Sequence, residues 1–378
     1  MRFADIIGYE DLKKALVGMA DASRVPHALL LYENEGCGAV PLALAFSQYL
    51  ACEHPINGDS CGVCPSCNRM QKLIHPDLHF VFPVNAGSKS GKTAAKDLSS
   101  AFYMEDFRGL LRSNPWFMEA QLSETLGLET KTWDINVLEA RELSRELSLS
   151  AVENGWKTVL FYLPETLNVA AANKLLKLVE EPPEKTLFLF VTHQPSKVLQ
   201  TIFSRCQSLR LPPQSPQEIV RGLSSRGYEG PEAEEQARLC GGSLGVALQS
   251  LQSDDRAEQY FDWMAGLLQA LLKKDLLAAL AIGDEISALG SREKQKAFCI
   301  FASEVLRKIF LLQRGQESLA GLSTSRAAAL RELAGKVSRQ FAVKMLPVLD
   351  KTAYYIDRNV NQKILFTDLV DRMSLYII

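Results

Sequence analysis

Residues 28–51, ALLLYENEGCGAVPLALAFSQYLA, decide how the first part of this chain folds. Ala28–Tyr32 is an uninterrupted apolar run of strand length, and a loop containing Gly36 and Gly38 follows it. The apolar run from about Pro41 to Ala51 predicts a helix, because a proline in the first turn loses no hydrogen bond. A buried strand, a glycine loop and a helix in this order are the framework of a phosphate-binding loop.

The loop keeps this framework but lacks the residues that hold phosphate. A working loop reads G-x-x-x-x-G-K-[ST], in which the lysine neutralises the phosphates and the hydroxyl holds magnesium. Here Glu33 stands at the first glycine, Gly38 at the second, Ala39 at the lysine and Val40 at the hydroxyl. Glu33 and Glu35 would also repel phosphate oxygens. We expect nucleotide binding to be weak or absent.

The acidic pair that would hold magnesium on a later strand is also missing. The strand expected over Thr158–Leu163 places Tyr162 and Leu163 at the two acidic positions. Glu165 is a candidate for a shifted acid, but it follows Pro164 and is expected in the turn. We therefore expect no catalytic role for Glu165.

Four cysteines form a C-x8-C-x2-C-x2-C cluster that predicts a structural zinc site. The four are Cys52, Cys61, Cys64 and Cys67. Four thiolates complete a tetrahedron around Zn²⁺ and leave no position for a substrate water. Four unrelated reduced thiols are the alternative, which this spacing disfavours. The other cysteines are scattered and are expected to be ordinary core thiols: Cys37, Cys206, Cys240 and Cys299.

Composition excludes several classes of protein. The chain has 378 residues, 47% hydrophobic and 23% charged, with a net charge of −2. This composition is typical of a globular protein. The net charge lacks the excess of basic residues found in a protein that binds nucleic acid by charge alone. No signal-peptide pattern and no run of ~20 apolar residues occur, so we expect a cytoplasmic protein without disulfides and without membrane contact.

Alternating helix and strand patterns predict a parallel sheet covered by helices on both faces, followed by an all-helical part. Residues 85–134 have mixed periodicity and are interpreted as a surface insertion, helical around 101–112. The expected domains are an α/β domain over 1–212, a small helical domain over 213–254 and a helical domain over 255–378. The further strands are expected at 78–84, 186–191 and 207–211, and the helices at 9–21, 135–148, 169–181, 197–203, 260–273, 294–314 and 341–356.

Several motifs, in order along the chain, resemble one known family. AANKLLKLVEEPP at 171–183 is the most specific of them, and Ser204-Arg-Cys206 matches an SRC motif. The other matching segments are 24–30, His75-Pro-Asp77, the cysteine module and 240–248. Together they resemble the delta-prime family of bacterial DNA polymerase III clamp-loader subunits, which are AAA+ proteins. The resemblance covers residues 1–83 and 135–254, whereas 255–378 agrees only in length and character.

This resemblance implies an AAA+ domain with a zinc module at 52–67, a lid domain and a C-terminal collar domain. It implies that Arg205 is an arginine finger for a neighbour's ATP, positioned by Ser204 and Cys206, and that Gly245 replaces a nucleotide-sensing arginine. No ATP is expected in the chain's own site, which would make it a non-hydrolysing subunit. The implied partners are gamma/tau-type motor subunits and delta-type subunits in a hetero-pentamer. The sliding clamp and primer-template DNA would be contacted weakly or through the complex.

Two alternatives remain open. The first is an active ATPase that uses Lys92 in Ser90-Gly-Lys-Thr93, although Ala86 stands where the first glycine of that pattern is required. The second is a zinc protein that binds nucleic acid alone, although only Arg69 and Lys72 lie near the cysteine loop.

Overall fold

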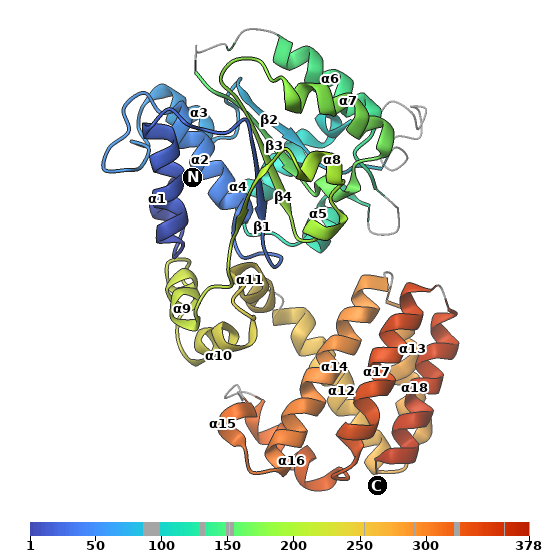
Figure 1. Cartoon of the computed structure of the whole chain (residues 1–378). Helices are drawn as coiled ribbons and strands as arrows, with labels where there is room; N and C mark the ends of the chain where they lie inside the picture. The colour runs from blue at the N-terminus through green and yellow to red at the C-terminus, as the bar shows by residue number, and fades with distance from the viewer. Residues whose placement is uncertain are drawn as a thin grey trace. The chain divides into compact units, whose positions relative to one another are not determined.

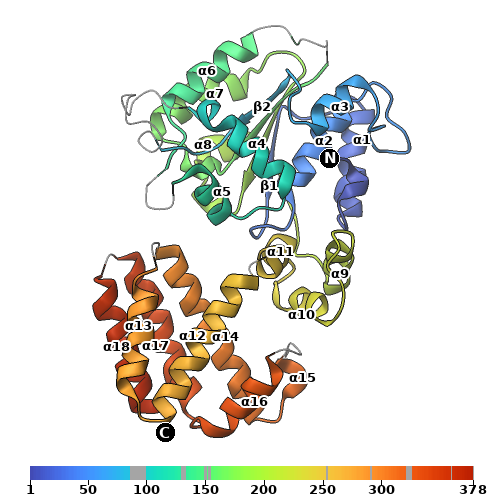
Figure 2. The same ribbon diagram turned by 180° about the vertical axis from the view of Figure 1, so that it is seen from behind.

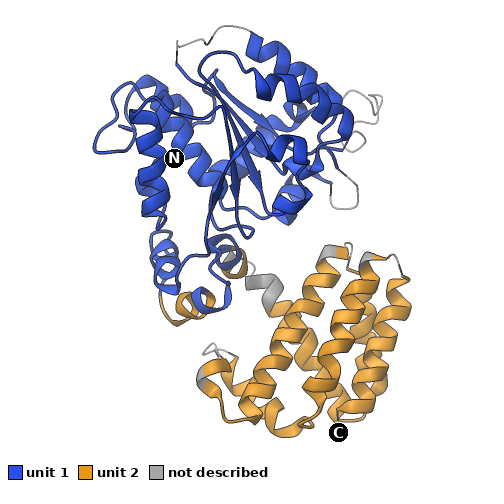
Figure 3. Cartoon of the chain, in the orientation of Figure 1, with its two compact units in different colours: residues 1–229, 237–248 blue, residues 230–236, 249–378 orange. Residues whose placement is uncertain are grey.

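The computed structural model describes residues 1–85, 99–128, 133–148, 151, 155–252, 254–289, 292–320, 326–358 and 360–377. They form two compact units (Figure 3). Unit 1 comprises residues 1–229 and 237–248, and unit 2 comprises residues 230–236 and 249–378. The division into three domains at 212 and 254 stays a prediction.

Unit 1 is built on a five-stranded parallel sheet in the order β2-β3-β4-β1-β5 (Figure 1). The predicted parallel sheet is confirmed. The expected strand at 78–84 ends earlier, at Val81, and the other strand boundaries agree within a residue. The strands are β1 (Ala28–Tyr32), β2 (Leu78–Val81), β3 (Lys157–Tyr162), β4 (Thr186–Thr192) and β5 (Gln207–Arg210).

Helices cover both faces of this sheet, because β1, β3 and β4 carry apolar side chains on both sides. One face packs against α6 (Val137–Ser148), α7 (Val169–Glu180) and α8 (Gln200–Phe203). The other face packs against α2 (Ala39–Ala51) and α4 (Met104–Ser113). Figures 1 and 2 show α7 and α4 on opposite sides of the sheet. Asn168 caps the start of α7, since its Oδ1 accepts a hydrogen bond from Ala171 N at 2.8 Å.

Residues 99–128 are not a loose surface insertion. They form η2 (Ser100–Tyr103), α4 and α5 (Glu119–Leu126), and the α5 helix was not expected. The fully buried Phe107 ring stacks on Phe82 at 4.1 Å and contacts Phe80 and Phe117. The aromatic side chains of this segment therefore complete the core on the α4 face. Residues 86–98 and 129–132, which include Lys92 and the Ser90–Thr93 motif, lie outside the described residues.

The remaining short elements of unit 1 surround the sheet. Ser215 opens α9 with a capping box, in which it and Glu218 exchange hydrogen bonds. These elements are η1 (Phe3–Asp5), α1 (Glu10–Asp21), α3 (Pro65–Gln71), η3 (Pro164–Thr166), η4 (Pro195–Lys197) and α9 (Pro216–Ser224), with α10 (Pro231–Leu239) and α11 (Leu244–Gln252) each divided between the units.

Unit 2 is helical throughout its described residues, as expected. One apolar cluster around Phe298, Phe341 and Phe366 forms its core, and α14 packs on α17 while α13 packs on α18. No described helix in the chain is long and apolar enough to cross a membrane. Its helices are α12 (Asp254–Leu272), α13 (Leu276–Ser287), α14 (Arg292–Gln313), α15 (Glu317–Ala320), α16 (Ala327–Lys336), α17 (Phe341–Asp357) and α18 (Gln362–Tyr376).

Candidate functional site

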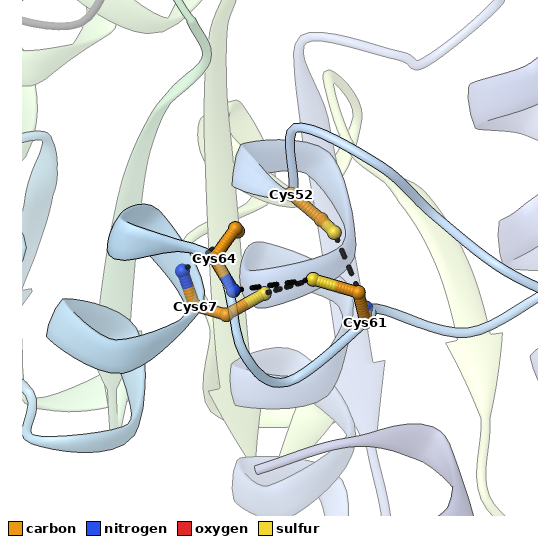
Figure 4. Close-up of side chains that lie close together, drawn as sticks. All are labelled: Cys52, Cys61, Cys64 and Cys67. Carbon is orange, nitrogen blue, oxygen red and sulfur yellow. Dashed lines mark hydrogen bonds between the residues drawn. The ribbon is translucent and has the colours of Figure 1, made fainter.

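The four predicted zinc ligands converge at the end of α2 (Figure 4). The sulfur atoms of Cys52, Cys61, Cys64 and Cys67 all lie within 4.8 Å of one another, and those of Cys61 and Cys67 are 3.9 Å apart. Four sulfurs bound tetrahedrally at ~2.3 Å from Zn²⁺ would be ~3.8 Å apart. The spacing of this cluster therefore fits a zinc ion, and all eight cysteines of the chain are free thiols.

Backbone N–H groups point at the sulfurs, as is favourable for thiolates. Cys61 N donates to Cys52 Sγ at 3.2 Å, and Cys64 N donates to Cys61 Sγ at 3.4 Å. Donation from the backbone of Val63 and Cys64 lowers the pKa of Cys61 to about 6. Burial raises the pKa of Cys67 and Cys52, so these two thiols would give up protons when a cation binds.

The degenerate phosphate loop is occupied by one of its own side chains. Glu33 Oε2 accepts a hydrogen bond from Ala39 N at 2.6 Å, and the backbone N–H groups of Gly38 and Gly36 also favour the charged form of this carboxyl group. These are the donors at the start of α2 that a phosphate would use. Burial raises the pKa of Glu33 to about 8, although the three N–H groups favour the charged form. The Glu33 carboxyl group therefore fills the position that a phosphate group would take.

Trp116 and the start of α11 close the loop from outside. The Trp116 side chain is only 4% exposed, and a Cβ at Gly38 would lie 3.0 Å from its Nε1. Gly245 N donates to Gly36 O at 2.9 Å, and a Cβ at Gly245 would lie 2.3 Å from Trp116 O. Position 245 thus lacks an arginine and, in addition, has no room for any side chain.

The two positions of the missing acidic pair hold buried apolar contacts. Tyr162 packs on the Phe117 ring at 5.0 Å, and its hydroxyl lies 3.2 Å from His193 Nε2. Leu163 begins the η3 turn, which contains Glu165 as expected. Glu165 Oε2 accepts a hydrogen bond from Thr192 Oγ1 at 2.8 Å, and burial raises the pKa of Glu165. Neither Tyr162 nor Leu163 offers a carboxylate to a metal ion.

Arg205 lies between α8 and β5 with its side chain 36% exposed. Its guanidinium pairs with Glu180 at the end of α7 and donates to Thr201 O at 2.8 Å and Ser204 Oγ at 3.4 Å. Cys206 Sγ donates to Ile202 O at 3.2 Å, and burial raises the pKa of this thiol to about 12. Ser204 and Cys206 therefore fix the local turn, and the arginine is held at the surface.

Sequence reasoning placed Glu33, Gly36, Gly38, Ala39 and Val40 in one loop but missed the residues that enclose it. Trp116, Glu119 and His193 come from other segments of the chain. His193 could have been found, because it directly follows β4 and side chains at the carboxyl ends of parallel strands gather at one edge. No sequence signal marked Trp116 or Glu119.

Comparisons with known proteins assign the family. The family described as DNA polymerase III, delta subunit, matches residues 8–215. The delta-prime subunit of DNA polymerase III from Escherichia coli is 28% identical over 370 residues, which are 96% of this chain and 93% of that protein. The chain belongs to the delta-prime family of DNA polymerase III clamp-loader subunits.

A second delta-prime subunit agrees with this assignment. The Pseudomonas aeruginosa delta-prime subunit is 30% identical over 257 residues, 67% of this chain and 63% of that protein. A gamma-subunit-related protein from Thermotoga maritima covers 96% of this chain and 99% of its own at 16% identity, with a TM-score of 0.45. The family assignment rests on the sequence comparisons.

Removal of one zinc ligand is expected to release the metal. Cys64→Ser should abolish stoichiometric zinc and lower the melting temperature, because the loop over residues 52–67 loses its crosslink. Metal analysis of the purified protein and a thermal melt measure both effects. Cys299→Ala removes a buried cysteine outside the cluster and should keep its zinc. Equal zinc content in the two variants would contradict the assigned ligands.

A methyl group at position 245 is expected to destabilise unit 1. Gly245→Ala should lower the free energy of unfolding by ~1–3 kcal/mol, since the added carbon collides with backbone. Gly18→Ala is the matched control, because it lies in α1 with no atom within 4 Å of its would-be Cβ. That change should leave stability equal or raise it by up to ~1 kcal/mol in denaturant unfolding. A stable Gly245→Ala would refute the close packing of loop and α11.

Proposed function

We propose that this chain is a non-hydrolysing subunit of the clamp loader, which supports ATP-dependent loading of the sliding clamp onto DNA during replication. It gives Arg205 to the ATP site of a neighbouring motor subunit. It acts in the cytoplasm, and its partners are gamma/tau-type and delta-type subunits in a hetero-pentamer. The clamp and primer-template DNA are contacted weakly or through the complex, and Zn²⁺ at the four cysteines is structural.

The Glu33 carboxylate at the start of α2 is the observation that carries this proposal. Phosphate would have to displace a buried side chain that already accepts a hydrogen bond from Ala39 N at the start of α2. The loop supplies no cation in return, because Ala39 stands at the lysine position. The energy source is therefore assigned to another subunit.

Arg205 supports the second half of the proposal. Its guanidinium is at the surface, and Glu180 and Thr201 O orient it before any partner binds. A planar guanidinium suits a phosphoryl group because its parallel N–H donors match two oxygens. A finger supplied by a neighbour stabilises the charge that develops on the transferred phosphoryl group.

Unit 2 supports assembly through exposed apolar side chains. The side chains of Leu277 on α13 and of Ile364 and Leu375 on α18 are 82%, 67% and 73% exposed. α13 and α18 pack on each other, so these residues belong to one helix pair. The DNA polymerase III subunit tau/gamma of Haemophilus influenzae is 25% identical over 294 residues, 75% of this chain and 36% of that protein. This likeness supports the proposal that the chain assembles with subunits of the same complex.

The isolated chain is expected to bind no ATP. Titration of a fluorescent ATP analogue with magnesium should show no saturable binding, because the anion position is filled and the metal anchors are absent. A motor subunit that retains lysine in its loop is the positive control. Micromolar binding abolished by Lys92→Ala would instead support the alternative of an active ATPase, and salt-dependent DNA binding by the lone chain would support a stand-alone nucleic-acid binder.

Removal of the Arg205 guanidinium is expected to reduce ATP turnover without preventing assembly. Arg205→Ala should slow the one ATP site that it faces by up to ~10³-fold, so that total turnover of the reconstituted complex falls. Arg112→Ala is the matched control, because Arg112 is also an exposed arginine paired with a glutamate, Glu105. Normal assembly with unchanged turnover would remove the arginine-finger assignment.

A further inference from the structure

Three ligand-type side chains outside the zinc cluster meet beside the degenerate phosphate loop. Glu35 comes from the loop, Glu119 from the first position of α5 and His193 from the residue after β4. One carboxylate oxygen of each glutamate and one ring nitrogen of His193 all lie within 4.8 Å of one another. Glu35 is fixed in place because its carboxylate accepts a hydrogen bond from Glu119 N.

One ring nitrogen of His193 makes no hydrogen bond to the described residues. Its side chain is 7% exposed, and Nδ1 has no hydrogen-bond partner among the described residues. Glu33 Oε1 lies 3.9 Å from Nδ1, which is too far for a hydrogen bond. Burial lowers the pKa of His193 to about 4, so the ring is neutral at physiological pH and this contact is not an ion pair. A buried neutral imidazole with a free nitrogen is a suitable metal ligand.

The surroundings resemble the second shell of a metal site. The Tyr162 hydroxyl lies 3.2 Å from Nε2, and a proton on Nε2 donated to that oxygen leaves the lone pair on Nδ1. Burial, together with the charges of Glu35 and Glu165, raises the pKa of Glu119 to about 7. A cation between these carboxylates would relieve their repulsion. Lys197 is the positive group that faces Glu119 and Glu165.

A cavity adjoins the cluster and gives room for the remaining ligands of an ion. Its volume is about 260 Å³, and Glu119, Glu165, Gln194 and Lys197 are among its lining residues. Glu165 Oε1 is buried and has no hydrogen-bond partner in the described part of the chain. Water bound to an ion held by Glu119 could donate to this oxygen.

We propose that Glu35, Glu119 and His193 bind a divalent transition-metal ion, such as Mn²⁺ or Zn²⁺, at the mouth of the disused nucleotide site. Two carboxylates and one imidazole suit such ions, and three protein ligands leave positions for water. The three ligands come from the loop, the 99–128 segment and the end of β4. The ion would therefore crosslink these three segments, which surround the degenerate phosphate loop.

Titration with Mn²⁺ and with Co²⁺ of protein that carries one zinc ion per chain, held by the four cysteines, tests this site. The probe ions are not expected to bind at the four cysteines, because zinc already occupies that cluster. In addition, Mn²⁺ prefers oxygen and nitrogen ligands to thiolates. Electron paramagnetic resonance of free Mn²⁺ and the visible spectrum of bound Co²⁺ report occupancy. The wild type should bind one ion per chain, with a Co²⁺ spectrum that lacks sulfur-to-metal charge transfer.

Variants identify the ligands. Glu119→Gln and His193→Gln should each weaken binding by at least ~10-fold, since loss even of an outer-shell partner commonly costs 10–100-fold. Glu124→Gln is the matched control, because it removes an exposed carboxylate from the same helix. Near-UV circular dichroism checks folding, and Glu35→Gln replaces any variant that fails to fold. Failure of both ions to bind to the wild type, or equal binding by ligand variants and control, would overturn the proposal.

Discussion

The N–H groups at the start of α2 converge on one anion position, and the Glu33 carboxylate occupies it. The first N–H groups of any helix lack partners within the helix and need an acceptor when they are buried. In a working phosphate loop the nucleotide supplies that acceptor. Here the acceptor belongs to the same chain, so the loop holds its shape without a ligand. The packing of other segments around this loop depends on the replacement of a phosphate group by the carboxyl group of Glu33.

Once phosphate is excluded, other segments are free to pack against the loop. Trp116 covers Gly38, and Gly245 approaches Gly36 so closely that a side chain would not fit. Tyr162 occupies an acidic position and packs on Phe117. Protein atoms therefore pack closely around Gly36 and Gly38, where Ala39 and Gly245 offer no cationic side chain.

The hydrophobic pattern of the sequence predicted the sheet well, because a short uninterrupted apolar run between turn residues seldom forms anything but a buried strand. In residues 99–128 it predicted the helix around 101–112, which η2 and α4 confirm, but it missed α5 and the burial of the segment. Phe107 and Phe117 look like exposed aromatics in a polar segment until Phe80 and Phe82 are placed beneath them. The burial that stabilises these helices is supplied by strand residues far away in sequence, which no local pattern contains.

Residue identity at fixed spacing determined the four cysteine ligands, the absence of a lysine and hydroxyl at Ala39 and Val40, and the SRC motif around Arg205. These motifs can be recognised in a short stretch of sequence, because their chemistry depends on which residues stand at a few neighbouring positions. Only the tertiary structure decided that Glu33 fills the anion position, and that Glu35, Glu119 and His193 meet. The last three lie far apart along the chain, and the sheet brings them together because its strands end at one edge.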